Sequence, residues 1–317
     1  MKIAFIFPGQ GAQYVGMGKA MAEMYPLARE TFEQADEALS FSIRNLMFSG
    51  PNETLRITYY TQPAILAVSI ACLRVFNAQS RLQPAFVAGH SLGEYTALVA
   101  AGSLSFEDAL RLVHLRGRLM DEAVPAGKGA MAAVLGADQV KLQALCEEIT
   151  ASLGQSVEIA NVNCPGQSVV SGAVAAVLAL IARAAEAKAR RAIRLDVSGP
   201  FHSSLMAPAG DKLETHLMAQ SMADPVCPVV ANVSALPLRD VHLIKKALAQ
   251  QVASPVLWEA SVETMIAGGA NAFVEFGPGA VLSGLIKKID KEVLTLHAED
   301  PKTLQTTLYA LGEGVSA

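Results

Sequence analysis

A serine stands between two glycines where a short apolar run gives way to a helical pattern, in FVAGHSLGEYTALVAAG, residues 86–102. The run before it is typical of a buried strand, and the run after it is typical of a helix that ends at Gly102. Gly89, Ser91 and Gly93 have the spacing of a tight strand-to-helix turn, in which a side chain at either glycine would crowd the backbone. The pattern therefore predicts a hydroxyl held out above the end of a buried strand, beside a helix N-terminus.

A serine hydroxyl at such a turn is typical of a nucleophile in acyl transfer. The N–H groups at the start of the helix can bind an oxygen that becomes negative during the reaction. The serine also needs a base. Of the six histidines, His202 is favoured because it follows VSGPF, where a glycine and a proline fix a loop. Asp196 is close enough in sequence to complete a triad with it. The alternative is that Ser91 only caps the helix.

Strands alternate with helices along most of the chain, which predicts an α/β fold whose parallel sheet is covered on both faces. Residues 127–196 differ, because their pattern gives the order β-α-β-β-α-β of a ferredoxin-like unit. We therefore predict a catalytic domain at residues 1–126 and 197–317, a smaller domain inserted at 127–196, and a ligand cleft between them. In the first part, Pro63 predicts the start of a helix.

The composition argues against several classes of protein. Hydrophobic residues make up 52% of the chain and charged residues 17%, and the net charge of -4 disfavours a nucleic-acid-binding protein. The apolar runs are shorter than the roughly 20 residues that cross a bilayer, so we expect no membrane segment. Cys72, Cys146, Cys164 and Cys227 have no paired spacing, which predicts neither a zinc site nor a disulfide framework and favours a reducing, cytoplasmic location.

Six motifs in order give the chain a specific resemblance: FPGQG, GHSLGEY, LRGRLM, NVNCPGQ, VSGPFHS and EFGPG. Together, over nearly the whole length, the chain resembles the malonyl-CoA:acyl-carrier-protein transacylases. The resemblance implies an α/β-hydrolase-like domain with a ferredoxin-like insert. It implies transfer of a malonyl group from malonyl-CoA to the phosphopantetheine thiol of acyl carrier protein, in fatty-acid or polyketide synthesis. It implies no metal and no redox cofactor.

The same resemblance assigns roles to individual residues. Ser91 would be the acylated nucleophile and His202 its base. A backbone carbonyl at Gln251 would orient the base, which favours a dyad over a triad with Asp196. Gln10 and Leu92 would give their backbone N–H groups to the oxyanion hole, and Arg116 would bind the malonyl carboxylate. Asn161 and Asn163 would line the cleft. Phe201 is a bulky residue of the kind found in members that prefer malonyl groups.

Arg116 also has a case from its own surroundings. It lies in a helical run among apolar residues, so we expect it to be partly buried, whereas Arg118 is expected to be a solvated surface arginine. A buried guanidinium needs a partner, and its planar fork matches a carboxylate. Loss of such an anion costs about 3–5 kcal/mol, enough to select malonyl over acetyl groups.

Basic pairs could steer an acidic carrier protein to the cleft. The candidates are KARR at residues 188–191, Lys245 with Lys246, and Lys287 with Lys288; the alternative is that each is an ordinary solvated face.

Two other functions remain alternatives to the transferase. A serine thioesterase or acyl hydrolase would share the nucleophile and the base but pass the acyl group to water. A non-catalytic subunit that binds carrier protein would have no need of Ser91, His202 and Arg116 together.

Overall fold

The computed structural model describes residues 1–125 and 127–313 and is a mixed α/β structure with two sheets. The larger sheet has the order β11-β10-β1-β2-β7-β8 and is parallel except for its last pair, as the alternating pattern predicts. Its strands are β1 (Ile3–Phe7), β2 (Phe86–Gly89), β7 (Val229–Val230), β8 (Pro237–Leu238), β10 (Ala272–Phe276) and β11 (Leu294–Ala298).

Helices cover both faces of the larger sheet, because alternate strand residues point into two different cores. Phe5 and Phe7 belong to the core on the side of α5, whereas Ala4 and Ile6 belong to the core formed with α12 and α13. The helices of this part are α1 (Lys19–Met24), α2 (Pro26–Leu39), α3 (Ile43–Ser49), α4 (Asn52–Leu55), α5 (Thr58–Gln79), α6 (Gly93–Ala100), α7 (Phe106–Ala123), α10 (Ala207–Ala219), α11 (Val241–Gln251), α12 (Trp258–Ala267), α13 (Val281–Ile289) and α14 (Pro301–Ala310).

Helix α5 corrects one prediction, because it begins at Thr58 and contains Pro63 rather than starting there. A proline in a helix leaves the carbonyl four residues earlier without its N–H partner. That carbonyl belongs to Tyr59, and it lies 2.7 Å from Nδ1 of His114 on α7. The neighbouring helix therefore supplies the hydrogen bond that the proline removes, and the helix continues.

The same helix bears on the expectation of no membrane segment. At 22 residues, α5 extends beyond the apolar run noted in the sequence, and by length and composition it is long and apolar enough to span a bilayer. However, 83% of its most apolar window is buried inside the protein. It forms the centre of the core beside the larger sheet.

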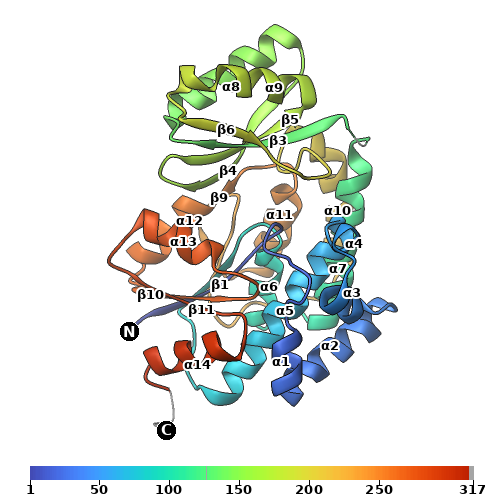
Figure 1. The fold of residues 1–317 in the computed structure, drawn as a ribbon, viewed down its shortest axis with the longest axis vertical. Helices are drawn as coiled ribbons and strands as arrows, with labels where there is room; N and C mark the ends of the chain where they lie inside the picture. Colours follow the sequence, from blue (N-terminus) through green and yellow to red (C-terminus); the bar gives the residue numbers. More distant parts are fainter. Residues whose placement is uncertain (126, 314–317) are drawn as a thin grey trace.

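The smaller sheet lies at the other end of the molecule (Figure 1) and has the order β6-β3-β5-β4-β9. Its elements follow the predicted β-α-β-β-α-β order: β3 (Gly129–Leu135), α8 (Gln139–Leu153), β4 (Val157–Cys164), β5 (Gln167–Ala173), α9 (Val174–Arg183) and β6 (Arg191–Arg194). Helices α8 and α9 cover one face. Met131 and Val169 on the other face line a cavity between the two sheets.

One strand of the smaller sheet comes from outside residues 127–196. Strand β9 (Val256–Leu257) comes from the later part of the chain and pairs in parallel with β4. The predicted first boundary, after residue 126, falls on a residue outside those described.

A buried carboxylate sets the start of helix α13. Glu275 on β10 is fully buried, and it accepts hydrogen bonds from the backbone N–H groups of Leu282 (3.1 Å) and Ser283 (2.8 Å). A carboxylate at this place satisfies N–H groups that have no partner within the helix. Burial nevertheless raises the pKa of Glu275 to about 7, which the bonds to Ser283 and Leu282 partly oppose.

This raised pKa predicts a pH-dependent stability that Glu275→Gln should remove. Between the ordinary value of 4.5 and about 7, the folded chain holds a proton that the unfolded chain has released. The contribution of Glu275 to stability therefore falls as pH rises through that window, by on the order of 1 kcal/mol per pH unit. Urea unfolding at several pH values should show wild type losing stability relative to Glu275→Gln. The exposed Glu263→Gln serves as control, and parallel curves for wild type and Glu275→Gln would contradict the assignment.

Candidate active site

The predicted strand-to-helix turn is confirmed in its backbone. Ser91 lies between β2 and α6 with a positive φ of 53°, which is strained for a residue with a side chain. A Cβ at Gly89 would come within 1.9 Å of the carbonyl carbon of Gly93. A Cβ at Gly93 would lie 2.1 Å from the carbonyl oxygen of Phe7. Both glycines are required because strand and helix backbones touch here.

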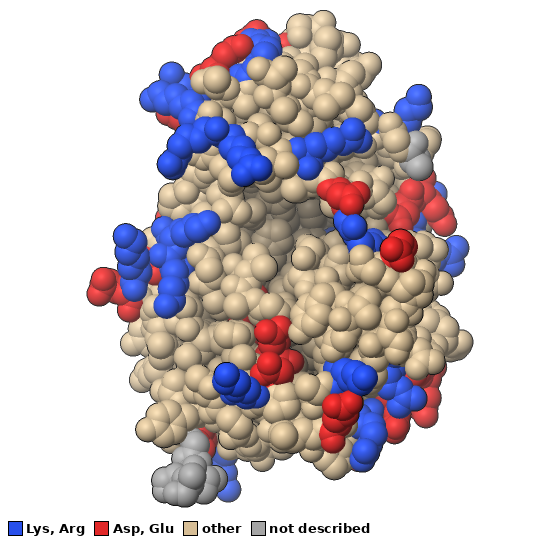
Figure 2. Space-filling model, viewed as in Figure 1, with Lys and Arg blue, Asp and Glu red and all other residues tan. Residues whose placement is uncertain are grey.

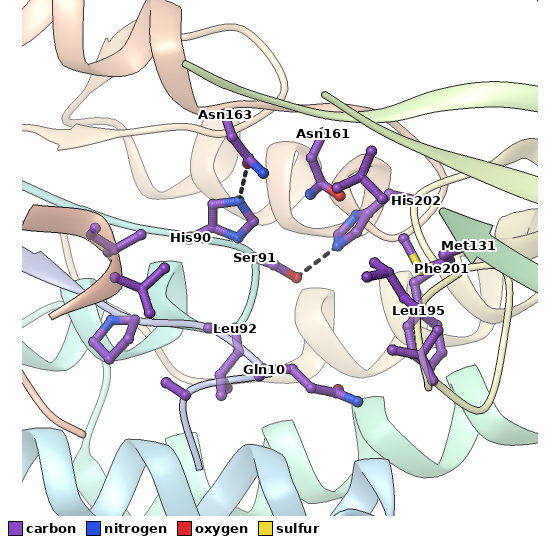
Figure 3. A pocket seen from close by; sticks show the side chains of 18 of the residues that line it. Gln10, His90, Ser91, Leu92, Met131, Asn161, Asn163, Leu195, Phe201 and His202 are labelled. Carbon is purple, nitrogen blue, oxygen red and sulfur yellow. Dashed lines mark hydrogen bonds between the residues drawn. The ribbon is translucent and has the colours of Figure 1, made fainter. Parts of the chain in front are cut away.

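Ser91 opens into a cavity of about 260 Å³ between the two sheets (Figure 3). The larger part of the molecule contributes one wall, and the open face of the smaller sheet contributes the other. All but one of the residues predicted for the site line this cavity: Gln10, Ser91, Leu92, Arg116, Asn161, Asn163, Phe201 and His202. Gln251 is the exception, because it lies buried beneath the cavity.

The favoured histidine contacts the serine. His202 Nε2 lies 2.8 Å from Ser91 Oγ, and His202 Nδ1 lies 2.8 Å from the carbonyl oxygen of Gln251. His202 also has a positive φ, 58°, so its loop is held in a conformation that side chains rarely adopt. The triad alternative is wrong: Asp196 is 87% exposed and pairs with Arg56. A backbone carbonyl, not a carboxylate, accepts from the base.

Arg116 is buried as predicted, with 1% of its surface exposed, whereas the side chain of Arg118 is 57% exposed. The guanidinium of Arg116 donates to Gln62 Oε1 (2.8 Å), Gln251 Oε1 (2.9 Å) and Ser91 Oγ (3.0 Å). These neighbours satisfy part of the hydrogen-bonding capacity of the guanidinium. Its Nε has no hydrogen-bond partner among the described residues.

The carbonyl of Gln251 fixes the direction of the serine proton. A carbonyl only accepts, so His202 Nδ1 carries the hydrogen and donates to it, and Nε2 of the neutral ring is unprotonated. Ser91 Oγ accepts from the guanidinium of Arg116, and its O–H donates to Nε2. This is the tautomer that a general base for Ser91 requires.

The charge state of His202 agrees with this assignment. Burial and, after it, the positive charge of Arg116 lower its pKa to about 3, although the bond to the Gln251 carbonyl opposes both. The imidazole is therefore neutral near pH 7, with its lone pair toward Ser91.

Two backbone N–H groups point to an anion site beside the serine. Those of Gln10 and Leu92 have no acceptor among the described residues, and both residues line the cavity. Unpaired N–H groups next to a nucleophile are suited to hold a developing oxyanion.

The cavity wall formed by the smaller sheet carries the predicted asparagines. Asn163 Oδ1 lies 2.9 Å from Nε2 of His90, so the ring of His90 turns away from the neighbouring Ser91 (Figure 3). This bond joins the serine turn to strand β4. Phe201, next to the base, is 5% exposed and lies at the cavity edge.

Three polar residues of the site were not predicted. Gln62, Glu94 and Asn232 are buried around Ser91 and Arg116. The glutamate had a sequence signal, because it is the one charged residue in an apolar helix three positions after the serine. Gln62 and Asn232 had no comparable sequence signal. Gln62 only precedes a proline, and Asn232 only follows a short apolar run. Among the described residues, no group of three or more His, Cys, Asp or Glu side chains could hold a metal ion.

Comparison with known proteins agrees with this site. The family model described as "Acyl transferase domain" matches residues 4–304. The chain is 49% identical to the malonyl CoA-acyl carrier protein transacylase of Bacillus subtilis, covering 98% of each chain, and 45% identical to that of Escherichia coli K12, covering 97% and 99%. Its fold matches the acyl-carrier-protein S-malonyltransferase of Bartonella henselae (TM-score 0.95, 41% identity, 98% and 100% coverage). It matches equally well a malonyl-transacylase in complex with a type II PKS acyl-carrier protein (TM-score 0.95, 41% identity, 98% and 100% coverage). The chain belongs to the acyl transferase domain family.

Proposed function

We propose that this protein transfers the malonyl group of malonyl-CoA to the phosphopantetheine thiol of an acyl carrier protein, through a malonyl ester on Ser91. One observation carries the proposal: Ser91 Oγ lies within hydrogen-bond distance of both the base His202 and the buried cation Arg116. Acyl transfer needs a nucleophile with a base, which Ser91 and His202 supply, and the cation suits an acyl group that ends in a carboxylate.

In the first half-reaction the malonyl carboxylate pairs with Arg116, which places the thioester carbonyl over Ser91. His202 Nε2 takes the serine proton as Oγ bonds to the carbonyl carbon. The negative oxygen rests on the N–H groups of Gln10 and Leu92. When the C–S bond breaks, His202 returns the proton to the sulfur, and coenzyme A leaves as a thiol.

The second half-reaction runs through the same groups in reverse. The phosphopantetheine thiol gives its proton to His202 and its sulfur attacks the ester carbonyl. The C–O bond breaks, and Ser91 recovers its proton from the imidazole. Neither step needs a metal or a redox cofactor.

The malonyl carboxylate also acts on the base. The charge of Arg116 is one cause of the low pKa of His202. An anion bound to Arg116 offsets that charge, so the pKa of His202 rises toward the operating pH when a malonyl group is present. An acetyl group has no such effect, which adds to the selectivity for malonyl groups.

A thioesterase or acyl hydrolase that uses the same serine and base is the alternative function. The contact between Arg116 and Ser91 favours the transferase, since hydrolysis requires no carboxylate ligand. A long-lived acyl-enzyme in the absence of acceptor thiol would distinguish the transferase from the hydrolase. We place the protein in the cytoplasm, in fatty-acid or polyketide synthesis.

We also propose the finer description of the fold. The strand order β6-β3-β5-β4 with two helices on one face supports a ferredoxin-like domain at residues 127–196. The parallel sheet with its serine turn supports an α/β-hydrolase-like domain at residues 1–126 and 197–317.

A basic groove beside the cavity is our candidate for the carrier-protein surface. Arg190, Arg191 and Lys288 line it, and Gln167 lines both the groove and the cavity. Basic side chains gather to the left of the central hollow in Figure 2, over the regions of β6 and α13 in Figure 1. Two of the three predicted basic segments thus meet at one place.

The third basic pair does not support this role. Lys245 is buried, and its ammonium donates to the carbonyls of Met218 and Gln220, so it holds α10 and α11 together. Its neighbour Lys246 is exposed and lines a different surface groove.

Mixing the protein with malonyl-CoA should increase its intact mass by one malonyl group, and Ser91→Ala should abolish the increase because no other hydroxyl contacts His202 Nε2 among the described residues. Mass spectrometry of the intact chain gives the answer, and the exposed Ser234→Ala serves as control. A normal increase in Ser91→Ala would exclude Ser91 as the nucleophile.

Arg116→Ala should lower the rate of Ser91 malonylation relative to acetylation by about 10²- to 10³-fold, because it removes the partner of the malonyl carboxylate. The rates with malonyl-CoA and acetyl-CoA are compared in rapid-quench experiments. Arg118→Ala, two positions along the same helix and exposed, should keep the wild-type ratio. Unchanged selectivity in Arg116→Ala would remove the assigned role.

Lys288→Glu should lower kcat/KM for an acidic carrier protein by about threefold or more at low salt and weaken its dependence on salt. The rate of Ser91 malonylation from malonyl-CoA should stay the same. Lys246→Glu is the matched control, with the same charge change elsewhere. Equal losses in both half-reactions would mean that the groove binds phosphates of coenzyme A rather than the carrier protein.

A further inference from the structure

Glu94 is a buried carboxylate that the mechanism above leaves unused. It lies in the first turn of α6, three residues after Ser91, with 1% of its surface exposed, and it does not line the cavity. Burial raises its pKa to about 7, while the Asn232 N–H, the Gln251 side chain and the charge of Arg116 favour its ionised form. Burying a carboxylate costs free energy unless hydrogen bonds or a nearby cation compensate for the lost water.

One oxygen of this carboxylate holds two residues of the site. Glu94 Oε2 accepts from the backbone N–H of Asn232 (3.0 Å) and from the side-chain amide of Gln251 (2.8 Å). The Asn232 side chain accepts in turn from the N–H of Ser91 (2.7 Å) and donates to the carbonyl of Gly89 (2.7 Å). Glu94 is therefore connected to both sides of the serine turn.

The second connection runs through Gln251 to Arg116. The amide nitrogen of Gln251 faces three acceptors, which are Glu94 Oε2, the carbonyl of Ser91 (3.0 Å) and Asn232 Oδ1 (3.2 Å). Its oxygen is left to face the guanidinium of Arg116 at 2.9 Å. Among the described residues Arg116 forms no direct ion pair, so the amide stands between a buried cation and a buried anion.

Glu94 is one of the acceptors that set which way this amide points. The carboxylate, the carbonyl of Ser91 and Asn232 Oδ1 all lie at the amide nitrogen, while the guanidinium of Arg116 donates to the amide oxygen. A hydrogen bond to a charged acceptor is stronger than one to a neutral amide, so the carboxylate holds this nitrogen more firmly than a glutamine at position 94 would. Loss of the charge therefore loosens Gln251 and, with it, the guanidinium.

We propose that Glu94 is a positioning residue for acyl-group selectivity: through Gln251 it holds the guanidinium of Arg116 in the orientation that receives the malonyl carboxylate. This inference rests on the proposed function. It differs from it in assigning part of the selectivity to a residue that touches neither the substrate nor the reacting atoms.

The test uses Glu94→Gln, which keeps the size of the side chain and removes the acceptor-only carboxylate. The rates of Ser91 malonylation and acetylation are measured by rapid quench and intact mass at about pH 8, where Glu94 is ionised. We expect the malonyl-to-acetyl ratio to fall at least about fivefold, as for loss of one hydrogen bond to a charged group. An unchanged ratio, or an equal fall in both rates, would overturn the proposal.

A double-mutant cycle then asks whether the effect passes through Arg116. In an Arg116→Ala background, Glu94→Gln should leave the ratio within about twofold of Arg116→Ala alone, because the shared path is already broken. A full additional loss would mean that Glu94 acts by another route and would overturn the proposal. Glu275→Gln is the matched control, a second buried carboxylate whose hydrogen bonds go to Leu282 and Ser283 at the start of α13, and it should keep the wild-type ratio.

The two levels of the argument fail separately. If wild type forms no malonyl ester on Ser91, or acylates equally well from acetyl-CoA, the proposed function is wrong. If wild type selects malonyl groups and Glu94→Gln does so equally well, only the role of Glu94 is wrong.

Discussion

The hydroxyl of Ser91 lies between a group that can only donate and a nitrogen that accepts, and the other features of the site serve to keep it there. Arg116 donates to the serine oxygen, and the unprotonated Nε2 of His202 accepts the serine proton. The guanidinium can remain buried because amide oxygens of Gln62 and Gln251 share its donors. Burying a charge without such partners would cost several kcal/mol. The serine is therefore prepared for reaction by the same cation that suits the substrate.

Gln251 joins the separate parts of this arrangement. Its backbone carbonyl accepts from His202, its side-chain oxygen accepts from Arg116, and its amide nitrogen reaches the carbonyl of Ser91. One residue at the end of α11 thus contacts base, cation and nucleophile. Gln251 is fully buried, and both polar atoms of its side chain form hydrogen bonds. A small displacement of this helix end would therefore change the positions of the base, the cation and the nucleophile together.

The sequence predicted those features of the site that depend on local backbone chemistry. The glycines around Ser91 are needed because backbones touch there, and short spacing carries that information. His202 was favoured because a glycine and a proline shape its loop. Pro63 misled the prediction of a helix start, because the missing hydrogen bond is supplied from α7, 55 residues from Tyr59.

The residues that were missed depend on contacts between distant segments. Glu94 meets Asn232 across 138 positions and Gln251 across 157. No local pattern encodes such a meeting, since it arises only when the larger sheet brings α6, the end of β7 and α11 together. Asp196 is the opposite case. It is close to His202 in the sequence, but its side chain faces solvent and pairs with Arg56 instead of contacting the histidine.

The close crossing of α5 and α7 has a consequence for redesign of the acyl pocket. A Cβ at Gly117 would lie 2.5 Å from the Cα of Tyr59, so the helix that carries Arg116 already touches α5 and cannot move closer to it. This contact limits how far the cationic wall can be displaced. Redesign to admit bulkier or branched acyl groups is better directed at apolar side chains of the cavity such as Met131, Val169 and Leu195.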